Sequence, residues 1–190
     1  MQINKSKLSN YLVTLKNKKF GNFSVSIPEF KSMCIARIAI PDLNHPDKVF
    51  ISNYQILYGD EKPWPEPEVP KKSPRPKIRA FWTSRRLLEH VIRSTHLAVD
   101  TTFKLTWQGF PVFMCGTTDL DKRYHPFGLG LCSEETFHDH AFIFDSIKKA
   151  ALEVYGFELK PTVLLADAAS EITNGFTRVF GEPVQYLFFF

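Results

Sequence analysis

Cysteine is scarce in this sequence, and the three cysteines present, Cys34, Cys115 and Cys132, show no spacing typical of metal ligands. Because their number is odd, an intracellular reducing compartment fits best, and we expect the thiols to act as small hydrophobic side chains. No apolar run approaches the roughly 20 residues that a membrane helix needs. Residues 1–5 also lack the apolar segment of a secretory signal. We therefore expect a nuclear or cytoplasmic protein that is neither secreted nor bound to a membrane.

Acidic residues are rare in two stretches, although the net charge of the whole chain is only +4. Between Lys5 and Lys31 six lysines face a single acid, Glu29. Residues 71–86 contain no acid and seven basic residues, which we call the basic block: Lys71, Lys72, Arg75, Lys77, Arg79, Arg85 and Arg86. Such a block can bind a nucleic-acid backbone by releasing its counterions. A solvated linker is the alternative that composition alone leaves open.

Proline is concentrated in one segment, because six of the 13 prolines lie between residues 59 and 79. Repeated proline prevents helix and sheet hydrogen bonding and favours an extended, semi-rigid linker. We therefore divide the chain into an accessory region of unassigned function (1–58), a proline-rich basic linker (59–79) and a domain (80–190). In the accessory region, the apolar stretches 34–40 and 49–57 are expected to be short strands between proline breakers such as Pro28 and Pro41.

Beyond the linker, the spacing of apolar residues predicts a helix followed by three strands. Ser84 is expected to cap a short helix. Residues 97–107 alternate strictly, which predicts a strand with Asp100 on the face opposite its apolar one. Residues 110–116 and 125–133 predict two more strands, joined by short turns into an antiparallel meander.

The rest of the domain predicts alternating helices and strands. Thr136 and Asp139 resemble a capping box at the start of a helix that Gly156 ends. The elements expected to follow are a short apolar strand over 163–166, a helix over 170–180 and a last strand over 184–190.

This succession predicts an α/β fold, in which parallel strands join the meander in a mixed sheet with helices on its faces. Numbered from residue 97, the strands would lie in the order 3-2-1-4-5, which resembles the RNase H-like fold, here truncated before its final helices. The first and fourth strands are neighbours in this order. Asp100 and Asp167, which ends the fourth strand, would therefore lie side by side.

Two neighbouring carboxylates predict a metal site. At about 5 Å and an effective dielectric near 20 they repel each other by roughly 3 kcal/mol, which a bound divalent cation relieves. Mg²⁺ (or Mn²⁺) suits such ligands and promotes phosphodiester transfer, so Asp100 and Asp167 are candidate catalytic and metal-binding residues. Other roles stay open, because Asp167 can complement the following helix and Asp100 can pair with Lys104.

Five motifs, in order, resemble the transposase domain of Mutator-like elements, the MULE family. They are Asp100-Thr-Thr-Phe-Lys104, Gly109-Phe-Pro111, Gly116-Thr-Thr-Asp119, Ser133-Glu-Glu-Thr136 and Asp167-Ala-Ala-Ser-Glu-Ile-Thr173. The resemblance covers residues 81–184. It implies that Asp100 and Asp167 are the first two carboxylates of a DDE-type triad, in proteins similar to enzymes that cleave and transfer DNA strands during transposition with a bound metal ion.

The sequence departs from this family at its end. The family continues with a Cys and His motif and a helical Glu that completes the triad, whereas this sequence ends in Leu187-Phe-Phe-Phe190. We expect Glu134 and Glu135 to be first-turn helix charges rather than substitutes for that Glu. Two carboxylates should hold Mg²⁺ weakly or not at all, so we expect a catalytically incomplete chain, a fragment or decayed copy of a transposase.

DNA is the expected partner, through the basic block and Lys104. No small-molecule substrate is expected, and homo-oligomer formation is left open. The alternative function is a non-catalytic nucleic-acid-binding or interaction module domesticated from a transposase. His138 and His140 lie two residues apart and point in different directions from a helix, so we expect exposed positions rather than a shared metal site.

Overall fold

The computed structural model describes residues 26–58, 76–102, 109–183 and 185–188. Within these ranges one mixed sheet has the strand order β1-β2-β5-β4-β3-β6-β7. Its strands are β1 (Phe50–Leu57), β2 (Lys77–Thr83), β3 (His96–Thr102), β4 (Val112–Thr118), β5 (Tyr124–Cys132), β6 (Val163–Ala166) and β7 (Gln185–Phe188). The helices are α2 (Ile27–Ala36), α3 (Arg85–Ile92), α4 (Phe137–Tyr155) and α5 (Ser170–Phe180). None of these helices has both the length and the apolar surface that a membrane span requires.

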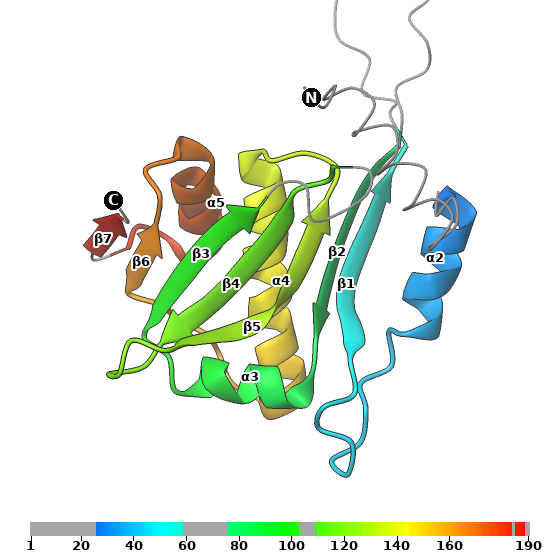
Figure 1. Cartoon of the computed structure of the whole chain (residues 1–190), viewed down its shortest axis with the longest axis horizontal. Helices are drawn as coiled ribbons and strands as arrows, with labels where there is room; N and C mark the ends of the chain where they lie inside the picture. Colours follow the sequence, from blue (N-terminus) through cyan, green and yellow to red (C-terminus); the bar gives the residue numbers. More distant parts are fainter. Residues whose placement is uncertain (1–25, 59–75, 103–108, 184, 189–190) are drawn as a thin grey trace, which may run out of the picture.

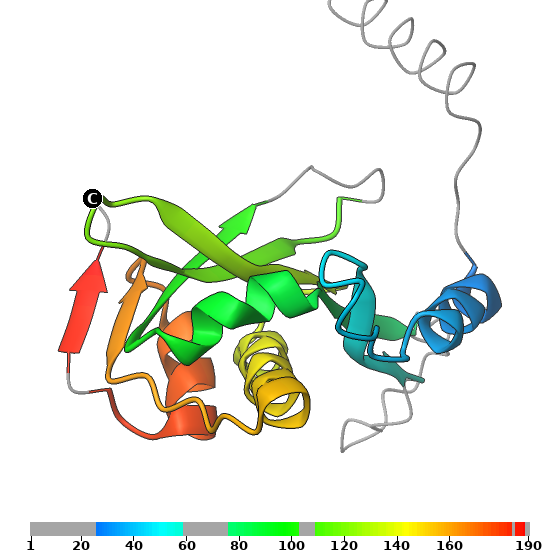
Figure 2. The ribbon, with the colours of Figure 1, turned by 90° about the horizontal axis from the view of Figure 1, so that it is seen from below.

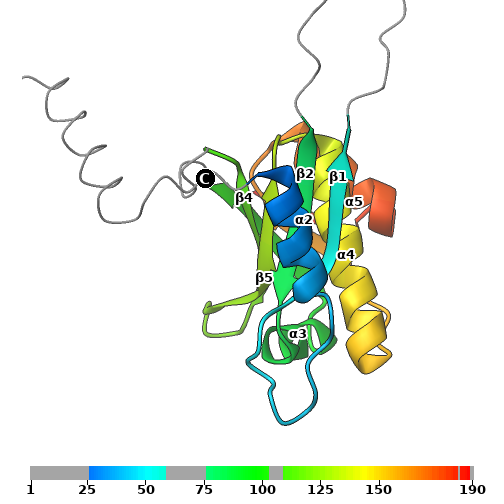
Figure 3. The same cartoon turned by 90° about the vertical axis from the view of Figure 1, so that its right-hand side faces the viewer.

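Helices cover the two faces of the sheet unequally (Figure 1, Figure 2). α4 and α5 pack on one face, and α3 closes the end of the same layer. α2 lies on the opposite side of the sheet, beside β1 and β2 (Figure 3). Among the described elements no helix covers β3, β4 and β6 on that second face, which we call the open face.

The main core lies between the sheet and the layer of α3, α4 and α5, and it is rich in phenylalanine. Burying a large apolar side chain stabilises a fold by about 1.5–3 kcal/mol, so this layer is the principal source of stability. The largest aromatic side chains that are fully buried are Phe50, Phe81, Phe113, Phe127, Phe144 and Phe176. A smaller core under α2 contains Phe30, Cys34, Ile51, Ile78 and Ala80.

The antiparallel meander and its parallel neighbour follow the sequence prediction. β3 pairs with β4, and β4 with β5, in antiparallel fashion, while β6 runs parallel to β3. The α/β class and the order β5-β4-β3-β6 are thereby confirmed. β7 pairs in parallel with β6. The predicted continuation of the first strand over 103–107 lies outside the described residues.

The helix ends match the predicted caps. At the start of α3, the Ser84 hydroxyl accepts the N–H of Leu87 at 3.3 Å. At the start of α4, the Asp139 carboxylate accepts the backbone N–H of Thr136 at 2.9 Å and its hydroxyl at 2.5 Å. Gly156 ends α4 with a φ of 64°, a left-handed conformation that favours glycine.

The strand predicted over 34–40 is wrong, because Cys34 lies in helix α2, which runs from Ile27 to Ala36. Ser26 caps this helix, and the Glu29 side chain accepts the Ser26 N–H at 2.8 Å in a reciprocal capping box. Pro28 is not a breaker here, since the first turn of a helix needs no N–H hydrogen bond. The capping box at the start of this helix is therefore a better guide to the structure than the apolar residues that predicted a strand.

The strand predicted over 49–57 corresponds to β1, but it belongs to a larger sheet than expected. β1 pairs with β2, and β2 pairs with β5. β2 begins at Lys77, inside the predicted linker, whose residues 59–75 lie outside the described ones. The structure thus joins residues 50–57 and 77–83 to the sheet of the predicted domain.

Candidate metal centre

Asp100 and Asp167 lie on neighbouring strands at the same level. In the parallel pair β3–β6, Ala98 is opposite Leu165. Two residues further along each strand come Asp100 and Asp167. Because side chains alternate between faces, and Val99 packs in the core under the helices, Asp100 faces the open face. Asp167 shares that direction, since Ala166 before it packs in the same core.

Both aspartates line a single cavity of about 340 Å³ on the open face, together with Ala98, Met114 and Tyr124. Both residues are exposed. The structure therefore brings the two predicted ligands together at the C-terminal ends of β3 and β6. Sheets of this kind collect ligands at these strand ends.

Each aspartate still has carboxylate oxygens that can bind a further ligand. Asp167 Oδ1 accepts the backbone N–H of Ala169 at 3.1 Å, so it does stabilise the approach to α5. Asp100 Oδ2 is 3.5 Å from the Thr102 hydroxyl, a long contact. Within the described part of the chain neither carboxylate forms an ion pair. The pairing considered for Asp100 with Lys104 falls on a residue outside that part.

The neighbourhood of the two aspartates is electrostatically negative. Glu135, in the turn before α4, has its pKa raised chiefly by burial. The negative charges of Asp167, Glu171 and Asp100 raise that pKa further. A divalent cation held near these groups would therefore find a favourable field.

A complete three-ligand site is not formed by the described residues, since no group of three His, Cys, Asp or Glu side chains among them is arranged to hold a metal. Glu134 is paired with Lys77 at 2.8 Å, and both side chains are about half exposed. Glu135 lies 3.8 Å from His140 Nε2. The centre therefore offers two carboxylates, leaving the other positions of an ion to water and phosphate oxygens.

His140 is a polar residue of this region that sequence analysis placed wrongly. The expected exposure holds for His138, whereas the His140 side chain is only 1% exposed. Its ring packs edge-on against Phe113, with 4.8 Å between centroids, and both ring nitrogens lack a hydrogen-bond partner among the described residues. The signal was present, because His140 precedes the core residue Phe144 by one helical turn.

Four of the predicted nucleic-acid ligands, Lys71, Lys72, Arg75 and Lys104, lie outside the described residues. The other four are already engaged in contacts within the chain. Lys77 pairs with Glu134, and the guanidinium of Arg86 pairs with Asp47 on the surface. Both pairs are exposed, and such pairs contribute little and can exchange partners.

Arg79 and Arg85 have structural partners. Arg79 Nε donates to Asp139 at 2.6 Å, and these side chains are 13% and 4% exposed. Arg85 Nε donates to the Pro41 carbonyl at 2.6 Å. Arg79 is therefore committed to holding β2 against the start of α4, and Arg85 holds the segment before β1.

Another cavity, lined by His90, His96, Asp119 and His125 among others, lies at the opposite end of the sheet, at the β4–β5 turn. His125 Nε2 is 2.9 Å from Asp119 Oδ2, and the His90 ring stacks on His125 with 4.5 Å between centroids. His96 Nε2 accepts the Thr118 N–H at 3.0 Å, so it carries no proton of its own. These nitrogens are used within the fold, and we assign this cluster a structural role.

Comparison of the chain with family models, with curated proteins and with solved structures finds no match. The likeness to MULE transposases therefore rests on the five motifs quoted above. Their two aspartates converge on one cavity, and that geometry is the basis for a functional proposal.

Proposed function

We propose that this chain holds a divalent cation, Mg²⁺ or Mn²⁺, between Asp100 and Asp167, in a domain derived from a MULE-type, RNase H-like DNA transposase. The observation that carries the proposal is that both carboxylates line one cavity on the open face, without an ion-pair partner among the described residues. The strand order through β6 and the five ordered motifs support it.

The chemistry follows from the ligand set. Carboxylate oxygens suit hard cations, which keep several coordination positions for water and substrate phosphate. An ion in that place polarises a phosphodiester and lowers the pKa of a bound water, so that the water can attack. In the family that this chain resembles, such a site cuts and joins DNA.

Metal binding tests the proposed site more directly than turnover does. The resemblance calls for a third carboxylate, and this sequence contains no residue that we assign to it. Two ligands position an ion poorly, and misplacement by about 1 Å can lower a rate on the order of a hundredfold. Metal binding, rather than turnover, is therefore the informative property.

Titration calorimetry with Mn²⁺ tests the metal site. We expect weak binding by the wild-type chain and at least a tenfold loss in Asp100→Asn and in Asp167→Asn, because each variant removes a negative ligand of similar shape. Asp121→Asn is the matched control, since that side chain is 74% exposed in a turn. Equal affinity in all four proteins would refute the proposed site.

A non-catalytic nucleic-acid-binding module is a second candidate, favoured by the exposure of Lys77 and Arg86, whose side chains are 51% and 56% exposed despite their pairing. It predicts DNA affinity that falls steeply with salt and does not change in Asp100→Asn or Asp167→Asn. Enhancement of DNA binding by Mn²⁺ in the wild-type chain alone would favour the metal site instead.

A further inference from the structure

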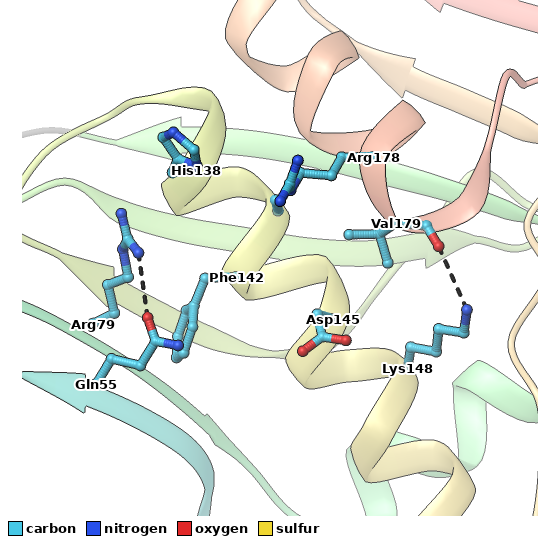
Figure 4. Close-up of a pocket in the computed structure, with 9 residues that line it drawn as sticks. Gln55, Arg79, His138, Phe142, Asp145, Lys148, Arg178 and Val179 are labelled. Carbon is cyan, nitrogen blue, oxygen red and sulfur yellow. Dashed lines mark hydrogen bonds between the residues drawn. The ribbon is translucent and has the colours of Figure 1, made fainter.

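A groove on the helical side of the molecule combines several hydrogen-bond donors (Figure 4). It encloses about 340 Å³ between α4, α5 and the β1–β2 edge. The polar side chains that line it are Gln55, Arg79, His138, Asp145, Lys148 and Arg178. None of them belongs to the metal centre, and α4 packs on the sheet face opposite Asp100.

Two of the charges in this groove are already balanced. Arg79 is paired with the buried Asp139 at 2.6 Å. Asp145 is paired with Lys149, one turn further along α4, also at 2.6 Å. Because each pair is neutral, neither Arg79 nor Asp145 determines the net charge of the groove.

Two cations form no ion pair with a carboxylate among the described residues. Lys148 Nζ donates to the Val179 carbonyl at 3.4 Å and lies 5.7 Å from the centre of the Phe180 ring, and its charge also helps to lower the pKa of Glu158. Arg178 is exposed and has no hydrogen bond or ion pair with a described residue. In Figure 4 its guanidinium extends from α5 across α4 toward the side of His138. The groove therefore has a net positive charge.

Uncharged donors add to this charge. Gln55 Oε1 accepts a hydrogen bond from Arg79 at 3.2 Å, which orients the amide and leaves its NH₂ group free to donate. The exposed His138 supplies a further ring nitrogen. Guanidinium, ammonium and amide donors around a small cavity match the tetrahedral oxygens of a phosphate group better than a flat carboxylate or an apolar ligand.

We propose that this groove binds a phosphate group, with Arg178 and Lys148 as its charged ligands and Gln55 and His138 as additional donors. The groove is larger than a phosphate group alone, and the two sources of phosphate that the test distinguishes are a nucleic-acid backbone and a free nucleotide. The proposal does not rest on the metal centre, because the two sites share no residue.

The test uses the full chain and two probes. Binding of inorganic phosphate is followed by ³¹P NMR, and binding of a short single-stranded DNA by fluorescence anisotropy. Arg178→Gln and Lys148→Gln should each weaken phosphate binding about tenfold, as expected for loss of a charge-assisted hydrogen bond. Lys31→Gln, an exposed lysine on α2, removes the same charge elsewhere and should change affinity less than twofold.

The DNA probe distinguishes the source of the phosphate. If a nucleic-acid backbone occupies the groove, the same two variants weaken DNA binding. Each variant also lowers the slope of log affinity against log salt concentration by about one. If DNA binding is unchanged while phosphate binding is lost, a free nucleotide is the ligand.

Asp100→Asn should bind phosphate normally, which separates this test from that of the metal site. Equal effects of Arg178→Gln and Lys31→Gln, or no phosphate binding by the wild-type chain, would overturn the proposal.

Discussion

The buried side chain of His140 makes the stability of this fold depend on pH. Burial lowers its pKa from 6.5 to about 4, although the negative charges of Asp139, Asp167 and Glu171 act in the opposite direction. The folded protein therefore holds the ring neutral where the unfolded chain would protonate it. The stability associated with His140 is complete above about pH 6.5 and is lost as pH falls toward 4.

The size of this effect can be measured. A pKa change of this kind corresponds to a loss on the order of 3 kcal/mol between neutral pH and pH 4. Urea unfolding of wild type and His140→Leu at several pH values should show a flatter pH dependence in the variant. His138→Leu, on the exposed side of the same turn, should keep the wild-type slope. Parallel pH profiles for wild type and His140→Leu would contradict a buried neutral histidine.

The two aspartates were predicted at this scale, whereas the burial of His140 was missed although its spacing from Phe144 indicates the core-facing side of α4. Asp100 lies on the polar face of a strictly alternating strand and Asp167 directly follows an apolar strand, so a short-range pattern indicated each position. The exposure of a histidine on α4 also depends on which side of the helix faces α5, and that is a long-range property. His140 is buried because α5 packs closely at its Cβ.

At the scale of elements, the contact between α4 and α5 depends on Gly175. A Cβ at this position would lie 2.6 Å from the His140 Cβ and 3.0 Å from the backbone nitrogen of Ala141. The two helices can therefore come this close because residue 175 has no side chain. Rigid backbone on the α4 side leaves little room for adjustment.

Gly175→Ala should therefore destabilise the protein by about 1–3 kcal/mol through overpacking. Helix propensity alone predicts the opposite sign, since alanine is favoured over glycine by up to about 1 kcal/mol in a helix. Asn174→Ala, an exposed neighbour on α5, should be neutral or slightly stabilising. Thermal unfolding of both variants decides between the two effects, and a stabilised Gly175→Ala would show that the helices are not in close contact there.

Most helices and strands were predicted from their local patterns, whereas β2 and α2 were not. α3 and α4 start at capping residues, and α3, α4 and α5 all have apolar stripes that are visible in the sequence. β2 has no clear alternation and lies partly in a proline-rich segment, yet it forms because β1 and β5 provide hydrogen-bond partners on both sides. α2 was missed because the capping box formed by Ser26 and Glu29 was not recognised and Pro28 was taken as a breaker.

For the whole molecule, the open face is the feature that connects the fold with the proposed metal site. The helical layer on the other face builds the core, while the open face over β3, β4 and β6 exposes the cavity with Asp100 and Asp167. Their separation in sequence is large, and the parallel pairing of β3 with β6 brings them to the same level. This proximity followed from the predicted strand order. The contacts of the basic block did not, since they depend on tertiary partners such as Asp139 and Asp47.

Paramagnetic NMR with Mn²⁺ tests the central claim most directly, because it locates the ion as well as detecting it. At substoichiometric Mn²⁺, resonances of Ala98 and Met114, which line the cavity with both aspartates, should broaden first. Resonances of Phe30 in the core under α2 should stay sharp, and Asp100→Asn should abolish the selective broadening. Broadening centred on other acidic residues, or unchanged in Asp100→Asn, would contradict a cation held between Asp100 and Asp167.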